Sequence, residues 1–240
     1  MTRFVLILVF LSLFQTSCSS NEDTPEPVLW INGTHAILTK VNNGNVNRFG
    51  TVARSGSNRT SVKNTLNNSW EVTTKEELDK MIDSLVAGRH NPMFLEEAEK
   101  YDIIKMSREE FENELSAVQD RDLIMYFRNM FEAYQAFGER AILAWDLSRA
   151  TQLCAFGYIA EFYTYEEAVD KAFAVGKVIQ NNFNSWDDFY TSYFYGYAYW
   201  SEDDLEDPRS EYSRRVNIYN DLKKDPKSPL NLDWNLELTR

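Results

Sequence analysis

The residues best suited to chemistry in this sequence are Trp145, Asp146 and Arg149, which stand within one turn of a predicted helix. Trp145 and Arg149 have i,i+4 spacing and Asp146 and Arg149 have i,i+3 spacing, so the guanidinium can reach both an indole face and a carboxylate. An arginine held in this way could bind an anionic ligand through paired hydrogen bonds. The same spacing also fits a structural clamp, which is the interpretation that we favour.

A histidine at a predicted turn is the second candidate. His90 follows Gly88-Arg89 at the end of one expected helix and precedes Asn91-Pro92, which is typical of the start of another. Its imidazole could serve as a general base or as a ligand for a bound molecule. It could equally hydrogen-bond a carbonyl at the preceding helix end or pack on an aromatic ring, and we favour this structural role.

Metal, cofactor and nucleophile chemistry has no sequence pattern to support it. The only other histidine is His35, and the sequence contains neither HExxH nor CxxC spacing. No nucleophile and base pair, and no phosphate-binding glycine loop, accompanies His90. We therefore predict no metal site and no cofactor, and we recognise no catalytic constellation.

These candidate residues need helices to position them, and the sequence predicts a mainly α protein. Thr74, Ser107 and Thr164 each precede a glutamate by three residues, which is the capping box of a helix start. Apolar residues then recur at helical spacing, and no useful run alternates with the period of a strand. The fold that we expect is a single multi-helix globular domain, mainly α, with an irregular N-terminal segment.

Weaker patterns mark the boundaries between these helices. Gly138 should break the longest helical pattern into two helices, and Gly157 should end the second of them. Residues 41–69 are rich in Asn, Gly, Ser and Thr, so we expect an irregular and largely exposed segment there. Asp207-Pro208 is typical of a helix start, and residues 227–240 should be extended.

The first residues have the pattern of an export signal. Met1-Thr2-Arg3 is a short, positively charged start, and an apolar run relieved only by Ser12 follows it. A helix formed by this run spans about 16 Å, which is too short for a bilayer core of about 30 Å, so the run is typical of a signal peptide. We predict a lipoprotein signal peptide over residues 1–17, a polar tether over 18–29 and an α-helical domain over 30–240.

Small residues lead from this run directly to a cysteine, in the order Gln15-Thr16-Ser17-Cys18. The order resembles the lipobox of bacterial lipoproteins, although Gln15 departs from the usual Leu, Val or Ile. In that family the cysteine is acylated, which implies fatty acids such as palmitate on Cys18 and anchoring to a membrane. Ser19 and Glu22-Asp23 favour the outer membrane of the cell envelope and leave a surface-exposed position open. An ordinary signal peptide with an accidental cysteine is the alternative.

Composition limits the partners and the redox chemistry. The chain has 240 residues, is 43% hydrophobic and carries a formal charge of −12. The length supports one sizeable core, and the negative charge repels phosphate backbones, so we expect no binding of nucleic acid. Cys154 is the only cysteine besides Cys18, so we expect no disulfide within the domain and a buried, unreactive thiol. The oligomeric state is left open.

An ordered set of short motifs carries a family resemblance. The motifs are Trp70-Glu71-Val72, Gly88-Arg89-His90, Ala144-Trp145-Asp146-Leu147-Ser148-Arg149, Glu166-Glu167-Ala168 and Ser185-Trp186, with Tyr193, Gly196 and Trp200 after them. Together they resemble the bacterial DUF1266 family, a domain of unknown function, over about residues 31–200. The resemblance implies that the chain shares the fold of this family, and it implies no activity.

Residues 186–200 are rich in aromatic side chains on both sides of their predicted helix. Either the helix is buried on two sides, or its outer tyrosines and tryptophans bind a carbohydrate or a protein. Our first hypothesis is an envelope lipoprotein whose non-catalytic domain binds a protein or glycan partner. The alternative is an envelope hydrolase with a site around His90, Asp146 and Arg149.

Overall fold

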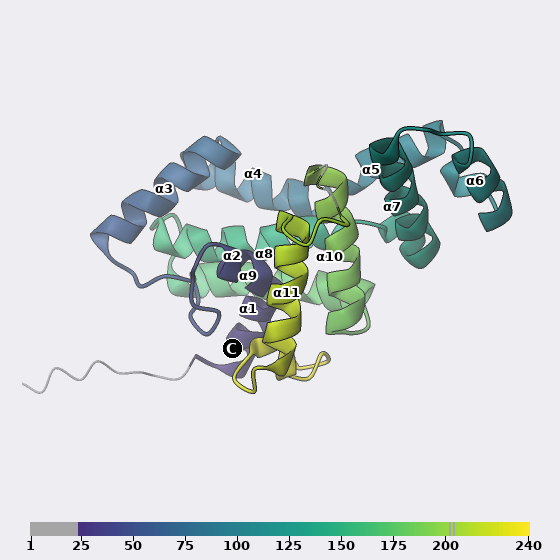
Figure 1. The fold of residues 1–240 in the computed structure, drawn as a ribbon. Coiled ribbons are helices and arrows are strands. Elements are labelled where there is room, and N and C mark those ends of the chain that lie inside the picture. The colour runs from purple at the N-terminus through teal and green to yellow at the C-terminus, as the bar shows by residue number, and fades with distance from the viewer. Residues whose placement is uncertain (1–23, 202, 204) are drawn as a thin grey trace, which may run out of the picture.

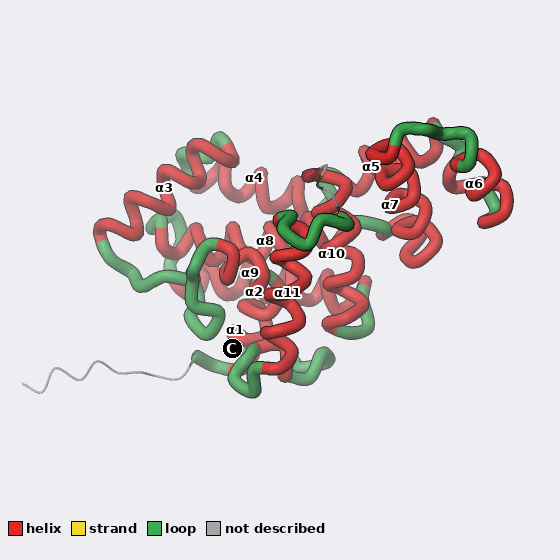
Figure 2. The backbone as a smooth tube through the Cα atoms, in the orientation of Figure 1, coloured by secondary structure: helices red, strands yellow, loops and turns green. Residues whose placement is uncertain are grey.

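Figure 1 shows the computed structural model, which describes residues 24–201, 203 and 205–240. Cys18, the predicted signal peptide and the first half of the predicted tether lie outside the described residues. Within the described part of the chain there are helices, turns and loops but no strand (Figure 2), so the prediction of a mainly α fold is confirmed. The helices are α1 (Glu26–Thr34), α2 (Ala36–Val41), α3 (Gly56–Trp70), α4 (Lys75–Val86), α5 (Asn91–Lys100), η1 (Ile103–Lys105), α6 (Arg108–Leu115), α7 (Arg121–Phe137), η2 (Gly138–Arg140), α8 (Leu143–Ile159), α9 (Tyr165–Asn182), α10 (Trp186–Ser201), α11 (Glu211–Lys224) and η3 (Pro229–Asn231).

Helix α8 is the element around which the others pack. Helices α4, α9 and α10 make the most extensive contacts with it, and its polar residues Asp146, Ser148 and Arg149 are buried together with its apolar ones. Helix α10 approaches so closely that a Cβ atom at Gly196 would collide with Cβ of Trp145. Because α8 is covered on nearly all sides, its charged side chains must find partners inside the protein.

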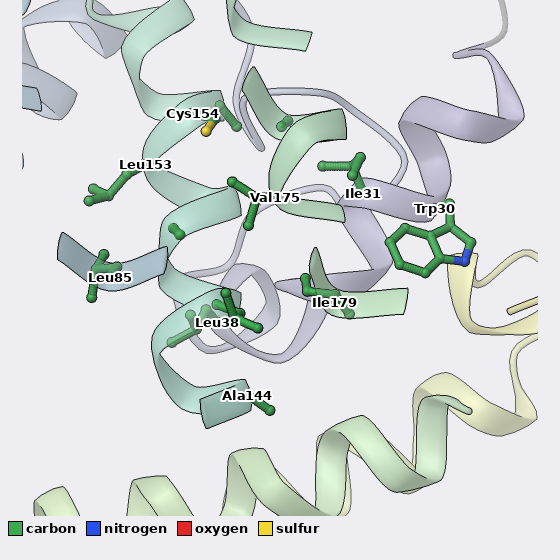
Figure 3. Packing of buried hydrophobic residues seen from close by; sticks show 14 of the residues in the cluster. Trp30, Ile31, Leu38, Leu85, Ala144, Leu153, Cys154, Val175 and Ile179 are labelled. Atoms are coloured by element: carbon green, nitrogen blue, oxygen red, sulfur yellow. The ribbon is translucent and has the colours of Figure 1, made fainter. Parts of the chain in front are cut away.

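The larger of two hydrophobic cores surrounds α8. Figure 3 shows part of it, where Ile31 of α1, Leu153 and Cys154 of α8, and Val175 and Ile179 of α9 pack together. Cys154 is fully buried, and burial raises the pKa of its thiol to about 12. The thiol is therefore protonated at neutral pH, as expected of an unreactive cysteine.

A second, smaller core lies at the end of the molecule formed by α5, α6 and α7 (Figure 1). It contains Phe94, Phe111 and Phe131, and the Phe111 and Phe131 rings stack at 4.1 Å. Helix α10 lies between the two cores, since Tyr193 belongs to the first and Tyr199 packs against the second. Of the two readings of its aromatic residues, the structure therefore supports burial on two sides for most of the helix.

Three tryptophans pack together and bring the first helix into contact with the C-terminal residues. The rings of Trp30 in α1, Trp186 in α10 and Trp234 lie 5.0 to 5.3 Å apart. Each indole N–H donates to a backbone carbonyl, those of Trp234, Leu232 and Phe183 respectively. The C-terminal residues are thus anchored to the first core, through a segment that contains the short helix η3 where we expected an extended chain.

The capping boxes were reliable guides to helix starts. At Thr74, Ser107 and Thr164 the hydroxyl accepts from the backbone N–H three residues on, and the glutamate at that position reaches back to the cap. Gly138 separates α7 from α8, with φ of +57°. Each of these signals acts within one turn, so tertiary packing did not override it.

Other boundaries were predicted wrongly. Residues 41–69 contain α3, because Ser55 caps its start and Val62, Leu66 and Trp70 form a narrow stripe at i,i+4 spacing. Gly157 lies inside α8, where the ring of Tyr163 occupies the space of a side chain. The last helix is capped by Ser210 and not opened by Asp207-Pro208. Helix α1 begins at Glu26, within the predicted tether.

None of the described helices combines the length and the apolar character that crossing a bilayer would need.

His35 gives the fold a measurable dependence on pH. Its ring is almost fully buried at the junction of α1 and α2, with Nδ1 bonded to the Thr39 hydroxyl at 3.0 Å. Burial lowers the pKa of His35 from 6.5 to about 4, against a smaller opposing backbone hydrogen bond. Between those pH values the unfolded chain binds a proton that the folded chain does not, so stability falls as the pH falls from 6.5 to 4.

We expect this one residue to cost about 3 kcal/mol of folding free energy between pH 7 and pH 4. The measurement is urea denaturation across this range for the wild type and for His35→Gln, which keeps polarity without the titration. The carboxylates are common to both proteins, so the difference between their curves isolates His35. If the unfolding free energies of the two proteins changed in parallel with pH, the His35 ring would not be held neutral by the fold.

Candidate functional site

A glycine turn places His90 against α8. Helix α4 ends at Val86, and Gly88 adopts φ of +80°, in the left-handed region that favours glycine. The chain then reverses and α5 begins at Asn91, which makes His90 the N-cap residue of α5. His90 has no side-chain bond to its own helix, so the start of α5 must be satisfied by another element.

That element is the carboxylate of Asp146, which is fully buried in α8. Its Oδ2 accepts the backbone N–H groups of His90 at 2.8 Å and of Asn91 at 3.2 Å. Its Oδ1 accepts from Arg149 Nη2 at 2.7 Å and lies 2.7 Å from His90 Nδ1. A buried carboxylate is stable only when paired and hydrogen-bonded, and these contacts supply both conditions.

The contacts place a proton on Nδ1 of the imidazole. An ionised carboxylate only accepts, so the short contact between Nδ1 and Oδ1 requires the proton of neutral His90 on Nδ1. The 2.9 Å separation of Nδ1 from Arg149 Nη2 then reflects two donors that share one acceptor. In the neutral ring the lone pair is then on Nε2, which has no hydrogen-bonding partner within the described residues. The side chain of His90 is 21% exposed.

Arg149 and Trp145 complete the group that the sequence singled out. The guanidinium Cζ lies 4.3 Å from the ring centre of Trp145 and 5.6 Å from that of Trp70, and Nε donates to the Trp145 carbonyl at 3.2 Å. Burial lowers the pKa of Arg149 to about 10, although Asp146 acts in the opposite direction. Arg149 therefore remains charged at neutral pH and neutralises Asp146.

The structure thus brings all four predicted residues, His90, Trp145, Asp146 and Arg149, into one connected cluster. An Asp–His pair with a free Nε2 has the arrangement of a general base. However, no hydroxyl or thiol among the described residues bonds to Nε2, and the four residues line neither of the two cavities described below. Their contacts clamp the α4–α5 turn onto α8. His90 does this through the Asp146 carboxylate and not through the helix-end carbonyl or aromatic ring that we expected.

Asn91 belongs to the same junction and was not predicted. Its side-chain amide donates to the Glu139 carbonyl at 2.7 Å and accepts from the Ile142 backbone N–H at 2.9 Å. It therefore fixes the turn between η2 and α8. The Asn-Pro pattern identified only a helix start, because these partners are about fifty residues away in sequence.

A cleft of about 750 Å³ lies on another part of the protein, between α5, α7, α10 and the loop after α10. Its described lining residues are Glu97, Tyr101, Asp120, Asp122, Leu123, Met125, Tyr126, Phe127, Asn129, Ala198, Asp203 and Leu205. Four of them are acidic, and none is a lysine or arginine. Tyr101 and Leu123, two of the large hydrophobic residues exposed to solvent, are also among them.

The acidic groups of the cleft are held in place. Glu97 accepts from the Tyr199 hydroxyl at 2.7 Å, and burial together with this carboxylate raises the pKa of Tyr199. Asp120 caps α7 by accepting from the backbone N–H groups of Asp122 and Leu123. The donors in these bonds are uncharged groups, and no lysine or arginine is among the described lining residues.

A smaller pocket of about 200 Å³ adjoins the cleft. Tyr101 and Phe127 line both hollows, and their rings meet edge to face at 5.0 Å. The remaining lining is Ile103, Met106, Phe111, Glu114, Leu115 and Val118, which is almost entirely apolar. An apolar cavity of about 150 Å³ is large enough for a benzene ring, so this pocket can hold one apolar side chain.

Sequence reasoning did not identify this cleft. Its walls come from helices that are far apart in the chain, and each lining residue alone resembles an ordinary surface position. The one local signal was Leu123, which is apolar yet lies next to two charged residues at the start of α7 and is 47% exposed.

Metal ligation finds no support in the described residues, where no group of three or more His, Cys, Asp or Glu side chains could hold an ion. Neither the cleft carboxylates nor the His90 cluster forms such a group.

Comparison with known proteins places the chain in a family. The model of the family described as "Protein of unknown function (DUF1266)" matches residues 65–234. The match covers more than two thirds of the chain, so the chain belongs to the DUF1266 family, as the resemblance indicated. The matched range starts later than we expected and continues past residue 200, through α11 to Trp234. No curated protein and no solved structure matches the chain.

Removal of the Asp146 charge should destabilise the protein. We expect Asp146→Asn to lower the free energy of unfolding by about 3–5 kcal/mol, because Arg149 would remain buried without its anion. Chemical denaturation at neutral pH measures this. The control is Asp170→Asn, which breaks an exposed ion pair with Arg240 and should cost at most about 1 kcal/mol. Equal losses of unfolding free energy in Asp146→Asn and Asp170→Asn would contradict the structural role of Asp146.

Proposed function

We propose that this DUF1266 protein is a lipid-anchored protein of the bacterial cell envelope that binds a protein partner and performs no catalysis. The proposal combines the lipobox at Cys18 with the cleft between α5, α7 and α10. The single observation that carries the binding function is this cleft, which is acidic, partly aromatic and free of lysine and arginine among its described lining residues.

Charge and shape favour a basic protein segment as the occupant. Carboxylates at Glu97, Asp120 and Asp122 complement lysine and arginine side chains. The faces of Tyr101 and Phe127 can receive a cation, and the Lys100 ammonium already lies 5.1 Å from the Tyr101 ring centre. The adjoining apolar pocket can take one apolar side chain. An acidic glycan would be repelled. Of the two partners that we inferred from the sequence, a protein or a glycan, we therefore favour a protein.

A second candidate function rests on His90. The Nδ1–Asp146 pair leaves Nε2 as a free base, which is the arrangement that an envelope hydrolase would use to activate water. Asp146 also accepts two backbone N–H groups of the α4–α5 turn, and the cluster lines neither cavity. We therefore rank this function second.

Binding should depend on the cleft carboxylates. The probe is a short peptide of lysines and arginines around one phenylalanine, compared by calorimetry with the same peptide carrying glutamates. We expect the basic peptide alone to bind, more weakly at higher salt. The double variant Glu97→Gln, Asp122→Asn should bind it about tenfold more weakly, which corresponds to about 1.4 kcal/mol.

The matched control is Glu76→Gln, Glu166→Gln, which removes the same charge from exposed positions outside the cleft and should bind as the wild type does. Equal weakening of peptide binding in both double variants would mean that only the net charge matters, and would contradict binding in the cleft. Turnover of an ester or glycoside substrate that His90→Gln abolishes would favour the hydrolase instead.

Lipid anchoring is tested separately. We expect Cys18→Ser to move the protein from the membrane fraction of a bacterial host to the soluble fraction, and to abolish labelling by palmitate. The physical reason is that each buried CH₂ of an acyl chain contributes about 0.8 kcal/mol to membrane binding. Cys154→Ala is the matched control and should stay in the membrane fraction. Unchanged fractionation of Cys18→Ser would contradict the anchor.

A further inference from the structure

Arg215 is a buried cation without a counter-ion among the described residues. It lies in α11, is 9% exposed and forms no ion pair with a described carboxylate. Its Cζ lies 4.2 Å from the ring centre of Tyr197, and Nη1 donates to the Tyr193 hydroxyl at 3.4 Å. Its Nε–H group is completely buried and has no hydrogen-bonding partner.

A second buried donor borders the same two tyrosines. Trp145 is 3% exposed, and its indole Nε1–H also lacks a partner. The Trp145 ring meets Tyr193 at 5.2 Å and Tyr197 at 5.7 Å, in both cases edge to face. Two N–H groups without an acceptor and one positive charge are therefore gathered around this pair of phenol rings.

Among the described residues, the neighbouring side chains do not pair with this positive charge. Burial raises the pKa of Tyr193 to about 12, so its phenol is neutral at physiological pH. Asp203 accepts from the Tyr197 hydroxyl at 3.2 Å and from the Tyr212 backbone N–H at 2.8 Å. Asp146 is occupied by Arg149 and the start of α5.

Burial acts to lower the pKa of Arg215, but the phenols of Tyr193 and Tyr197 outweigh burial and keep this pKa above its usual value, so the guanidinium stays charged. Two buried N–H groups without an acceptor still destabilise the fold, and among the described residues no carboxylate pairs with the charge. A water molecule could accept from the N–H groups but would leave the charge. We propose that a small monovalent anion of the size of chloride binds between Arg215 Nε and Trp145 Nε1.

Size and chemistry both favour such an ion. The donor atoms have almost no exposed surface, so a carboxylate on a large molecule could not reach them without displacing the aromatic rings. The edges of aromatic rings carry partial positive charge, which suits the surroundings of an anion. The site shares no donor with the acidic cleft, although the Tyr197 hydroxyl donates to Asp203 of the cleft lining, and it does not depend on the proposed binding function.

The test is thermal unfolding of the full domain in sodium chloride and in sodium gluconate at equal ionic strength, since gluconate is too bulky for the site. We expect a Tm about 3–6 °C higher in chloride when its concentration is about ten times the Kd. Arg215→Met removes the charge while filling the space, and Trp145→Phe removes only the indole donor and part of the ring. Both variants should lose the difference between the salts.

Arg214→Met is the matched control, because Arg214 is the exposed neighbour that pairs with Glu211, and it should keep the chloride effect. Crystals soaked in bromide should show an anomalous peak between Arg215 and Trp145. Equal Tm values for the wild type in the two salts would overturn the proposal. So would a chloride effect that persists in both Arg215→Met and Trp145→Phe, or bromide only at other positions.

Discussion

The buried carboxylate of Asp146 is the interaction on which the arrangement of the two cores depends. It belongs to α8, at the centre of the larger core, yet it caps the start of α5, which builds the smaller one. A charge removed from water tolerates few alternative geometries, because each displaced donor exposes the remaining charge to a medium that solvates it poorly. Asp146 therefore fixes the position of the second core and, with it, the wall of the cleft that α5 and α7 form.

Helix α10 explains why so much aromatic material occurs in one segment. One side of it packs against α8 through Tyr193 and Tyr197, and the other meets the second core through Tyr199. Gly196 allows the close approach to Trp145. Most of these rings are structural. The groups to which we assign a function lie beside this packing: the carboxylates of the cleft, and the N–H groups of Arg215 and Trp145 that have no acceptor.

How much of this structure the sequence predicts depends on whether a pattern acts between residues that are close together in the chain or far apart. The capping boxes at Thr74, Ser107 and Thr164 act within one turn and predicted their helices correctly. Gly157 was misinterpreted as a helix end because its role is to admit Tyr163 from outside the helix. The Trp145–Arg149 turn could be foreseen from helical spacing, and His90 was a candidate partner, but the backbone bonds to Asp146 could not. The cleft could not be predicted, because its walls come from helices that are far apart in the sequence and meet only in the folded protein.

The places where the chain enters and leaves the domain bear on its orientation. Helix α1 begins at the lower edge of the view in Figure 1, near the C-terminus, whereas α5, α6 and α7 form the upper right end. If lipid holds Cys18, the eight residues before Glu26 span at most about 28 Å whatever their conformation. The side of the domain where α1 begins would then lie within that distance of the bilayer. The end formed by α5, α6 and α7, which lies on the other side of the molecule in Figure 1, would be farther from it, so a basic partner could approach the cleft there with less competition from anionic headgroups.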